Sequence, residues 1–305
     1  TLSEAGVTAG GAAYASEGGQ EHFDSTFGEV GPWAPSGKQP LHVATRNCVP
    51  DETISQNVRA ALEFNFPNFE RCKPTDVGAV LVSGGPSFTN FLPKIRALAA
   101  AGCPVLCVKS SHDTLIANGI VPLGCFLLDP RPMVLDFVAE PHPDVNYIIA
   151  TMVHASTFER MKERNAKVWV YHAKVGAAGE EEVFKLGGVV VSGGSTAATR
   201  GMVIMEGMGF REIHAFGFDS AYGARNALAE YKGAHFDKDR LTVEVDGRRY
   251  ETDPQLVAQG QDLQFILNQM PHVNFTFYGT GLGQTTVRAM QAKIRALPDW
   301  REIYA

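Results

Sequence analysis

Short apolar runs alternate with amphipathic segments from about residue 50 onward, and this alternation constrains the fold more than any other feature. Short runs of continuous apolar residues predict strands that are buried on both faces, which a parallel sheet between two layers of helices provides. The sequence therefore predicts an α/β fold with a mostly parallel sheet and helices on both faces. The predicted strands are Ala79–Val82, Pro104–Lys109, Cys125–Leu128, Tyr147–Ala150, Lys167–Tyr171, Glu212–Phe216 and Asn274–Tyr278. The predicted helices begin near Asp51, Phe88, Asp113, Ser156, Thr196, Pro254 and Thr285.

Two parts of the chain depart from this alternation. Leu241–Thr252 alternates apolar and polar residues around Asp246-Gly247, a pair typical of tight hairpin turns, and it predicts a β-hairpin beside the main sheet. Residues 1–45 are rich in Gly, Ala, Ser and Glu and show no helical or strand period, so they predict an irregular N-terminal arm. We expect one domain over residues 46–305, and an arm that is able to make contacts in a homo-oligomer or another assembly.

Composition narrows the classes of partner. The chain has 305 residues, of which 45% are hydrophobic, so it can bury a large core. Its net charge of −6 argues against strong nucleic-acid binding and against an anionic membrane surface as partner. No apolar run reaches the roughly 20 residues that cross a bilayer. The five cysteines are odd in number and lack CxxC spacing, which favours buried free thiols. We expect a cytoplasmic protein.

Glycines and a serine follow the strand Ala79–Val82, in the segment Ser83-Gly84-Gly85-Pro86-Ser87. Glycines let the backbone approach an anion, and the N-terminus of the helix that follows presents unpaired N–H groups to it. Ser83, Gly84, Gly85 and Ser87 are therefore candidates for binding the phosphates of a nucleotide. The alternative is a tight strand-to-helix turn with Ser87 as a helix cap.

A second turn, Ser192-Gly193-Gly194-Ser195-Thr196, repeats this pattern before the predicted helix at Thr196. Gly193, Gly194, Ser195 and Thr196 are candidates for a second phosphate or sugar-hydroxyl site. The alternative is close packing of the helix on the sheet, which also requires small residues.

Two aspartates follow predicted strands, at the sheet edge where ligands of open α/β sheets collect. Asp129 lies in Leu128-Asp129-Pro130 and Asp219 in Gly217-Phe218-Asp219. Either carboxylate can hold Mg²⁺ or orient a hydroxyl group, so both are candidate catalytic and metal-binding residues. The alternative for each is a turn residue without a ligand. Tyr222, three residues after Asp219, is a candidate for stacking on a substrate ring.

Other polar residues at predicted loops complete the candidate list. Ser110, Ser111 and His112 follow the strand Pro104–Lys109 and are candidate substrate-binding residues, or a helix N-cap. His235 lies in a polar stretch and is a candidate catalytic base, although a loop histidine is more often a surface residue.

Several well-known motifs are absent. There is no G-x-G-x-x-G after a strand, which disfavours a dinucleotide-dependent oxidoreductase. The segment Gly31 to Gln39 lacks the spacing and the hydroxyl residue of a P-loop. Neither Ser87 nor Ser195 lies in a G-x-S-x-G elbow, so a serine hydrolase is disfavoured as well.

Five segments with distinctive residues follow one another along the chain, and they are Val80–Phe88, Asn118–Pro122, Leu128–Pro130, Gly193–Thr196 and Gly217–Tyr222. In this order they resemble the MptE-like family, also described as a domain shared with flagellin motility accessory proteins. The resemblance runs from the helix that contains Ile54-Ser55-Gln56-Asn57 to about Gly283. The first turn departs from the family's usual Gly-x-Gly-Pro-Ser, and Leu123 stands where an aspartate is expected.

This resemblance implies a Rossmann-like domain that binds a nucleotide and transfers part of it. The archaeal member is a 6-hydroxymethyl-7,8-dihydropterin diphosphokinase, which moves diphosphate from ATP to a hydroxymethyl group with Mg²⁺ and leaves AMP. The motility branch is linked to attaching nonulosonic acid sugars to flagellin. The glycine turns also look like those of CMP-sialic-acid-dependent sialyltransferases.

Three functional hypotheses follow, in order of preference. The first is Mg²⁺-assisted transfer of a phosphorylated group from ATP, or another nucleotide, to a small hydroxyl-bearing acceptor such as a pterin. The second is a glycosyltransferase that uses a nucleotide sugar. The third is a non-catalytic binding or assembly protein that has kept the fold.

Overall fold

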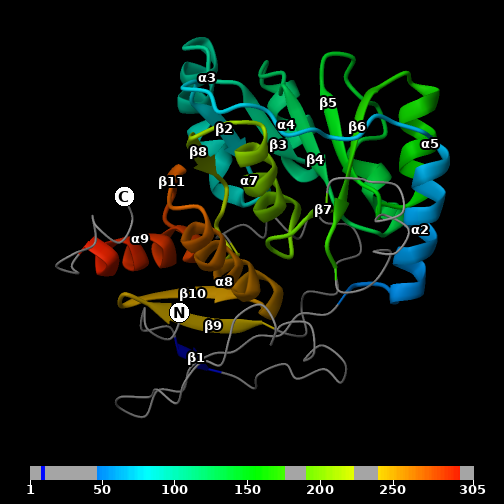
Figure 1. The fold of residues 1–305 in the computed structure, drawn as a ribbon. Coiled ribbons are helices and arrows are strands. Elements are labelled where there is room, and N and C mark those ends of the chain that lie inside the picture. Colours follow the sequence, from blue (N-terminus) through cyan, green and yellow to red (C-terminus); the bar gives the residue numbers. More distant parts are fainter. Residues whose placement is uncertain (1–7, 11–46, 176–189, 223–239, 296–305) are drawn as a thin grey trace.

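The computed structural model describes residues 8–10, 47–175, 190–222 and 240–295 (Figure 1). Its centre is a sheet of eight strands in the order β11-β8-β2-β3-β4-β5-β6-β7, and every neighbouring pair is parallel. The α/β prediction is confirmed. The strands are β2 (Ala79–Val82), β3 (Val105–Val108), β4 (Gly124–Leu127), β5 (Asn146–Ala150), β6 (Lys167–Ala173), β7 (Val190–Val191), β8 (Glu212–Phe216) and β11 (Asn274–Tyr278).

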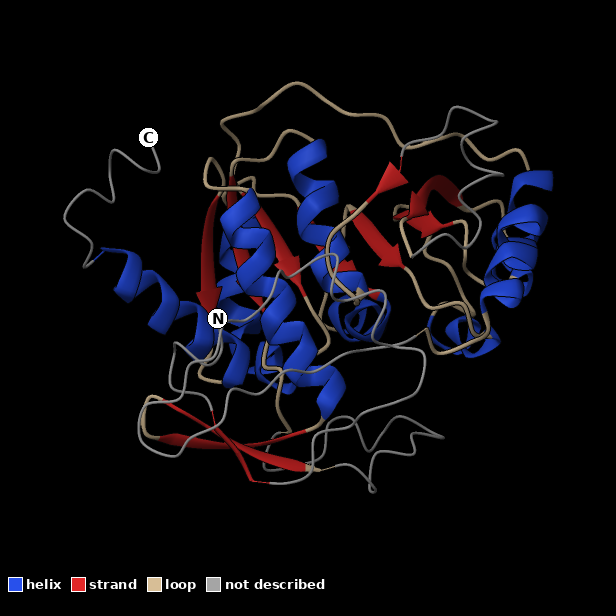
Figure 2. Cartoon of the chain, turned by 60° about the horizontal axis from the view of Figure 1, so that its bottom comes forward, coloured by secondary structure: helices blue, strands red, loops and turns tan. Residues whose placement is uncertain are grey.

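Helices cover both faces of this sheet (Figure 2). The α-helices are α2 (Asp51–Glu63), α3 (Leu92–Ala100), α4 (Lys109–Ala117), α5 (Ala155–Glu163), α7 (Ala197–Gly207), α8 (Pro254–Gln269) and α9 (Leu282–Arg295). Two 3₁₀ turns, η2 (Pro86–Phe91) and η3 (Pro132–Phe137), begin with prolines, whose fixed φ suits the first position of a helical turn. Within the described ranges, no helix is long and apolar enough to span a bilayer.

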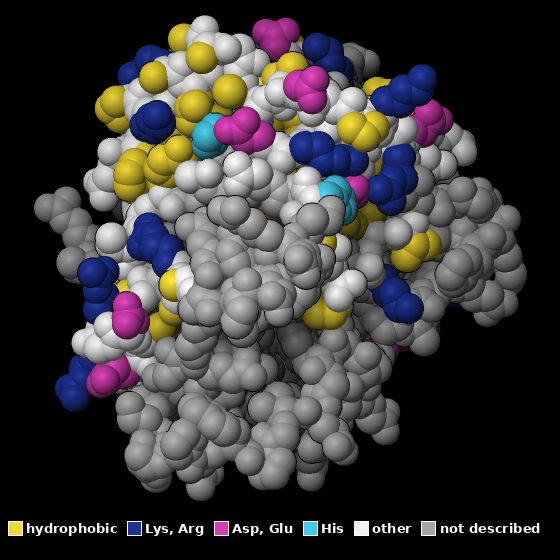
Figure 3. Space-filling view, turned by 60° about the vertical axis from the view of Figure 1, so that its left-hand side comes forward, with side chains coloured by type: hydrophobic (Ala, Val, Ile, Leu, Met, Phe, Trp, Pro, Cys, Tyr) yellow, Lys and Arg dark blue, Asp and Glu magenta, His cyan; other side chains and the backbone are white. Residues whose placement is uncertain are grey.

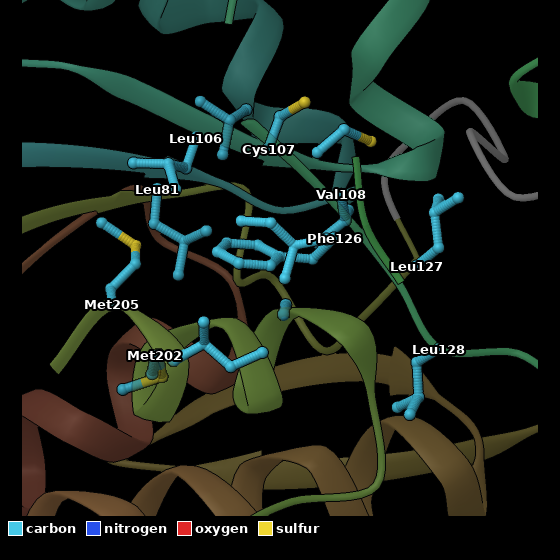
Figure 4. Packing of buried hydrophobic residues seen from close by; sticks show 14 of the residues in the cluster. Leu81, Leu106, Cys107, Val108, Phe126, Leu127, Leu128, Met202 and Met205 are labelled. Atoms are coloured by element: carbon cyan, nitrogen blue, oxygen red, sulfur yellow. The ribbon is translucent and has the colours of Figure 1, made fainter. Parts of the chain in front are cut away.

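The main core contains buried residues of the strands and of the helices that pack on them, among them α7. Figure 4 shows Met202 and Met205 of α7 facing Leu81 and Phe126 of the strands. Gly201 of α7 packs against the Phe126 ring so closely that a Cβ there would lie 2.8 Å from a ring carbon. This contact explains why a glycine stands at position 201 of the helix.

The predicted β-hairpin is confirmed as β9 (Leu241–Val245) and β10 (Arg248–Thr252). Asp246 and Gly247 both have positive φ, at 52° and 73°, as a two-residue hairpin turn requires. The hairpin lies beside α8 (Figure 1) and encloses a second, small core with Val257 and Leu282. A short strand from the N-terminal arm, β1 (Thr8–Gly10), pairs antiparallel with β9. The rest of the arm lies outside the described residues.

The structure differs from the sequence prediction at one helix start that matters for the site. The helix predicted from Asp113 begins at Lys109, directly after β3, because no turn residue separates strand from helix. Ser110, Ser111 and His112 are therefore helical residues and not loop residues.

The five cysteines differ in how far they are exposed. All five cysteines are free, but only Cys107 and Cys125 are buried, whereas Cys48 and Cys72 are exposed.

Figure 3 shows acidic and basic side chains mixed over one face of the molecule. That the chain does not bind nucleic acid strongly stays a prediction from its net charge of −6.

Candidate functional site

The strand order brings the candidate residues to one edge of the sheet. The chain enters at β2, continues outward through β3 to β7, and returns to place β8 on the other side of β2. Such a reversal leaves a crevice at the carboxyl ends of the central strands, which is where ligands of open α/β sheets bind. The first turn follows β2, Asp129 follows β4 and Asp219 follows β8.

The first turn binds a carboxylate of the protein itself. Asp219 Oδ2 accepts the Ser87 backbone N–H at 2.7 Å, and Asp219 Oδ1 accepts the Ser87 hydroxyl at 2.5 Å. The Gln284 amide donates to the same Oδ1 at 2.7 Å. Asp219 is only 4% exposed and Gln284 is fully buried. The Ser87 N–H and hydroxyl, which the sequence predicted to bind a phosphate, therefore donate to a carboxylate of the protein itself.

The glycines of the first turn lie close to residues 217–220, which follow β8 and which we call the β8 turn. The Gly85 N–H donates to the Gly217 carbonyl at 2.8 Å, and a Cβ on Gly85 would lie 2.4 Å from that oxygen. A Cβ on Gly84 would lie 2.0 Å from the Ser110 hydroxyl of α4. Close packing is a sufficient reason for both glycines, and their contact with a phosphate stays a prediction.

The second turn repeats the arrangement of the first. Asp262 of α8 accepts both the backbone N–H and the hydroxyl of Ser195, at 2.7 and 2.6 Å. Burial raises the pKa of Asp262, although the two Ser195 hydrogen bonds oppose that shift. Thr196 and Thr199 form a capping box at the start of α7. The buried Arg200 guanidinium donates to the Gly194 carbonyl at 2.9 Å and so fixes the glycine turn.

A glutamine of α8 joins the two turns. The Ser220 hydroxyl donates to the Gln259 carbonyl oxygen at 2.8 Å, and the Gln259 amide donates to the Thr196 hydroxyl at 3.3 Å. Gln259, Asp262 and Gln284 were not predicted from the sequence. A signal was present for two of them, because Gln259 and Asp262 are polar residues one helical turn apart on an otherwise apolar, buried face of α8.

Asp129 has a different environment, between two cations. Its carboxylate accepts Lys109 Nζ at 2.8 Å and two nitrogens of Arg131 at 2.9 and 2.8 Å. Burial alone would raise the pKa of Asp129. The Arg131 hydrogen bonds and the Lys109 charge outweigh burial and hold the pKa well below its usual range.

The residues after β3 do not share one environment. The Ser111 hydroxyl is buried and donates to the Val82 carbonyl at 2.9 Å. His112 is fully buried and lies between Asp113 and the Tyr147 hydroxyl, at 2.7 and 2.9 Å. Both side chains are held inside the fold because the helix begins at Lys109, so in this structure they are not open to a substrate. Ser110 is partly exposed and lies against the first turn.

Tyr222 is also engaged within the protein. Its hydroxyl donates to Asp253, the N-cap of α8, at 2.5 Å, and the Arg240 guanidinium lies 5.0 Å from the ring centroid. Stacking on a substrate ring stays a prediction. His235 lies outside the described residues.

The two aspartates do not fit one shared metal ion. β2 and β3 separate β8 from β4, so three strand spacings place the two strand ends roughly 14 Å apart. Mg²⁺ requires its oxygen ligands at about 2.1 Å. In the part of the chain that the structure describes, no three His, Cys, Asp or Glu side chains gather as a metal site. Magnesium stays a prediction from the sequence.

His172 is a buried histidine at the carboxyl end of β6 that the sequence analysis did not select. Its Nδ1 lies 2.9 Å from the Thr151 hydroxyl, and the side chain is almost fully buried. Burial lowers the pKa of His172, because an imidazolium ion loses its hydration there. The folded protein therefore holds this imidazole neutral below the pH at which an exposed histidine is protonated.

This neutral imidazole predicts a dependence of stability on pH. As the pH falls below about 6.5, the unfolded chain binds a proton at His172 that the folded chain resists, so the free energy of unfolding decreases. In His172→Asn, whose amide can replace Nδ1 toward Thr151, we expect a smaller decrease between about pH 7.5 and about pH 5.5. Urea denaturation at both pH values measures this, and equal decreases in the two proteins would contradict it.

The fold is similar to that of a solved enzyme, the MAf glycosyltransferase from Magnetospirillum magneticum AMB-1. The two proteins share 16% sequence identity with a TM-score of 0.55, over 81% of this chain and 42% of that chain. This likeness shows the fold alone, and the chain spans less than half the length of that glycosyltransferase. Among curated proteins, none matches the sequence of this chain.

The family comparison is more specific. Residues 52–225, which are more than half of the chain, match the family described as 6-hydroxymethylpterin diphosphokinase MptE-like. This region contains both glycine turns, Asp129 and Asp219, so it covers all five segments on which the sequence resemblance rested and the lead-in segment Ile54-Ser55-Gln56-Asn57 as well. The chain therefore belongs to the MptE-like family.

Proposed function

We propose that this protein is a nucleotide-dependent transferase that moves a sugar from a nucleotide-sugar donor to the hydroxyl group of a small acceptor. The observation that carries the proposal is that both carboxylates at the predicted ligand-binding edge already have partners within the protein. Asp219 is engaged by Ser87 and Gln284, and Asp129 by Lys109 and Arg131. Sugar transfer does not require Asp129 and Asp219 to give up these partners and bind a metal ion together.

Glycosyl transfer requires that the negative charge on the leaving phosphate be neutralised, and fixed cations can do this without a metal ion. In glycosyl transfer the bond between the anomeric carbon and the donor's phosphate oxygen breaks, and the acceptor oxygen bonds to that carbon. The phosphate leaves with the bonding electron pair, and the acceptor's proton passes to a base. Fixed cations and N–H groups beside the leaving oxygen stabilise the charge that develops on it. His235, the base predicted from the sequence, keeps that role as a prediction.

Diphosphate transfer from ATP is the second candidate, and the description of the family favours it. That reaction neutralises a larger phosphate charge, for which Mg²⁺ bound between carboxylates and phosphate oxygens is the usual solution. It would require Asp129 or Asp219 to exchange its present partners for the ion.

The nucleotide product separates these candidates. The protein would be incubated with a CMP-sugar, a UDP-sugar and ATP in turn, each with Mg²⁺ and with EDTA, and with a mixture of hydroxyl acceptors. Chromatography would then identify the nucleotides formed. We expect the protein to release CMP or UDP from the corresponding nucleotide sugar in the presence of EDTA. Formation of AMP from ATP in Mg²⁺ alone would support the second candidate, and no turnover of any donor would contradict both.

A further inference from the structure

His172, at the carboxyl end of β6, is buried and keeps one ring nitrogen without a partner. The residue is 2% exposed, and its Nδ1 lies 2.9 Å from the Thr151 hydroxyl. Across the described parts of the chain, its Nε2 makes no hydrogen bond. Folded proteins rarely leave a polar group unpaired in the interior, because that group loses the hydrogen bond it made to water. A ligand group that bonds to Nε2 would complete the surroundings of this imidazole.

His112 is the other buried histidine of the described chain, and its surroundings are different. Its Nδ1 lies 2.7 Å from the Asp113 carboxylate, and its Nε2 lies 2.9 Å from the Tyr147 hydroxyl. Both ring nitrogens of His112 therefore have partners within the protein, and the residue needs no ligand. His172 differs because one of its two nitrogens is available.

The register of the sheet places His172 at the edge where ligands of open α/β sheets bind. Asp129, Thr151 and His172 each stand three positions beyond residues that are paired across β4, β5 and β6. The Thr151 N–H donates to the Tyr171 carbonyl at 2.9 Å, so the ladder between β5 and β6 continues to this level. Adjacent strands lie about 4.8 Å apart. Thr151 is thus one strand spacing from Asp129, and His172 is two.

His172 also lies next to the second glycine turn. β7 pairs with the end of β6 at His172, and the second turn, which begins at Ser192, follows β7 directly (Figure 1). The buried Arg200 guanidinium donates to the Lys174 carbonyl at 2.5 Å and to the Gly194 carbonyl at 2.9 Å. It therefore fixes the end of β6 relative to the second turn, which the sequence predicts to bind a phosphate or a sugar hydroxyl.

We infer that His172 is the general base of the proposed sugar transfer, with Thr151 as a positioning residue that accepts the Nδ1–H and leaves the Nε2 lone pair for the acceptor hydroxyl. This inference rests on the proposed function. As the acceptor oxygen bonds to the anomeric carbon, its proton moves to Nε2 and an imidazolium ion forms. The phosphate leaves with the electron pair of the broken bond, and the imidazolium later returns its proton to water.

The surroundings of His172 suit a base. Burial lowers the pKa of His172, so the imidazole is neutral at neutral pH and able to accept a proton. The group that faces Nδ1 from β5 is the uncharged Thr151 hydroxyl, which fixes the orientation of the ring. A base must lie within hydrogen-bond reach of the proton that it accepts, and Nε2 is the nitrogen that no described residue occupies.

The test measures release of CMP from a CMP-sugar, or of UDP from a UDP-sugar, in EDTA with two kinds of acceptor. The first is the hydroxyl acceptor, and the second is sodium azide, which attacks the anomeric carbon without giving up a proton. In His172→Asn, whose amide keeps a partner for Thr151, we expect kcat with the hydroxyl acceptor to fall roughly a hundredfold or more while KM stays unchanged. Azide should restore nucleotide release toward the wild-type rate, because it needs no base.

Thr151→Val and Thr151→Ser test the positioning role. Thr151→Val removes the hydroxyl that faces Nδ1, and we expect kcat with the hydroxyl acceptor to fall roughly tenfold, the effect of losing one neutral hydrogen bond. Thr151→Ser keeps the hydroxyl and should keep most of the rate. His272→Asn, which changes an exposed histidine paired with Glu206, is the matched control and should react as the wild type does.

The other outcomes separate the inference from the proposed function. Wild-type kcat in His172→Asn, with the loss found in His235→Asn instead, would overturn the inference and leave the function intact. Failure of azide to restore nucleotide release in His172→Asn would assign His172 a structural role and would also overturn it. The absence of CMP or UDP release by the wild type would contradict the proposed function itself.

Circular dichroism and urea denaturation check that each variant folds. If His172→Asn does not fold, the two Thr151 variants decide the question, since both change a side chain by no more than a methyl or a hydroxyl group. Equal kcat values for Thr151→Val, Thr151→Ser and the wild type would then contradict the inference.

Discussion

Replacing Asp219 by alanine is expected to lower the free energy of unfolding by roughly 3–5 kcal/mol, because it leaves several donors without an acceptor in a buried site. The Asp219 carboxylate accepts the N–H and hydroxyl of Ser87 and the amide of Gln284. The Gln284 side chain is fully buried, so its amide cannot turn to bulk water without moving α9. Nucleotide binding should be lost together with stability, and urea denaturation measures the stability effect.

Two variants make this result specific. Asp219→Asn keeps one carbonyl acceptor and should lose less stability than Asp219→Ala. Asp136 in η3 is exposed, so Asp136→Ala should change the free energy of unfolding by less than about 0.5 kcal/mol. A loss of activity in Asp219→Ala with full stability would show that Asp219 acts on a ligand and does not hold the turn.

A methyl group at Gly85 is expected to have the second large effect. In Gly85→Ala the new Cβ would lie 2.4 Å from the Gly217 carbonyl oxygen and 2.8 Å from Asp219 Oδ2. Both distances are shorter than a Cβ makes in real proteins, so we expect the first turn and the β8 turn to separate and the Ser87–Asp219 hydrogen bonds to lengthen. Overpacking of this kind costs about 1–3 kcal/mol before the hydrogen bonds are counted.

Gly78→Ala is the matched control for this change. Gly78 immediately precedes β2, and a Cβ there would be no closer than 3.7 Å to any neighbour, which is ordinary contact. We expect Gly78→Ala to melt within a degree or two of the wild type, and Gly85→Ala to melt several degrees lower, since about 1 kcal/mol corresponds to roughly 2–4 °C in a domain of this size. Equal melting temperatures would mean that the two turns are not packed as described.

The architecture was predictable because it depends on local sequence patterns. Buried parallel strands appear as apolar runs such as Ala79–Val82, and the hairpin turn needs residues that accept positive φ, which Asp246 and Gly247 provide. The strand β7 was missed, since Val190–Val191 is too short to show a period. The start of α4 was also missed, because Lys109 passes from strand to helix without a turn residue.

The partners of the candidate residues were not predictable in the same way. Ser87 and Asp219 are 132 positions apart, and Ser195 and Asp262 are 67 apart. No local pattern reports such pairs. The sequence predicted a phosphate at each Ser-Gly-Gly turn, and in the structure the serine N–H and hydroxyl of each turn donate to an aspartate of the protein itself. An N–H group and a hydroxyl need an acceptor whether it comes from a ligand or from the chain, so the sequence could not say which acceptor each turn meets.

Thermal denaturation with nucleotides tests the central claim most directly. A donor present at about 100 times its dissociation constant stabilises the folded state by about 2.7 kcal/mol, which corresponds to a rise of roughly 5–10 °C in melting temperature. We predict such a rise with a nucleotide sugar or its nucleoside monophosphate in EDTA. An unchanged melting temperature with CMP, a CMP-sugar, a UDP-sugar and ATP, with and without Mg²⁺, would contradict a nucleotide-dependent transferase.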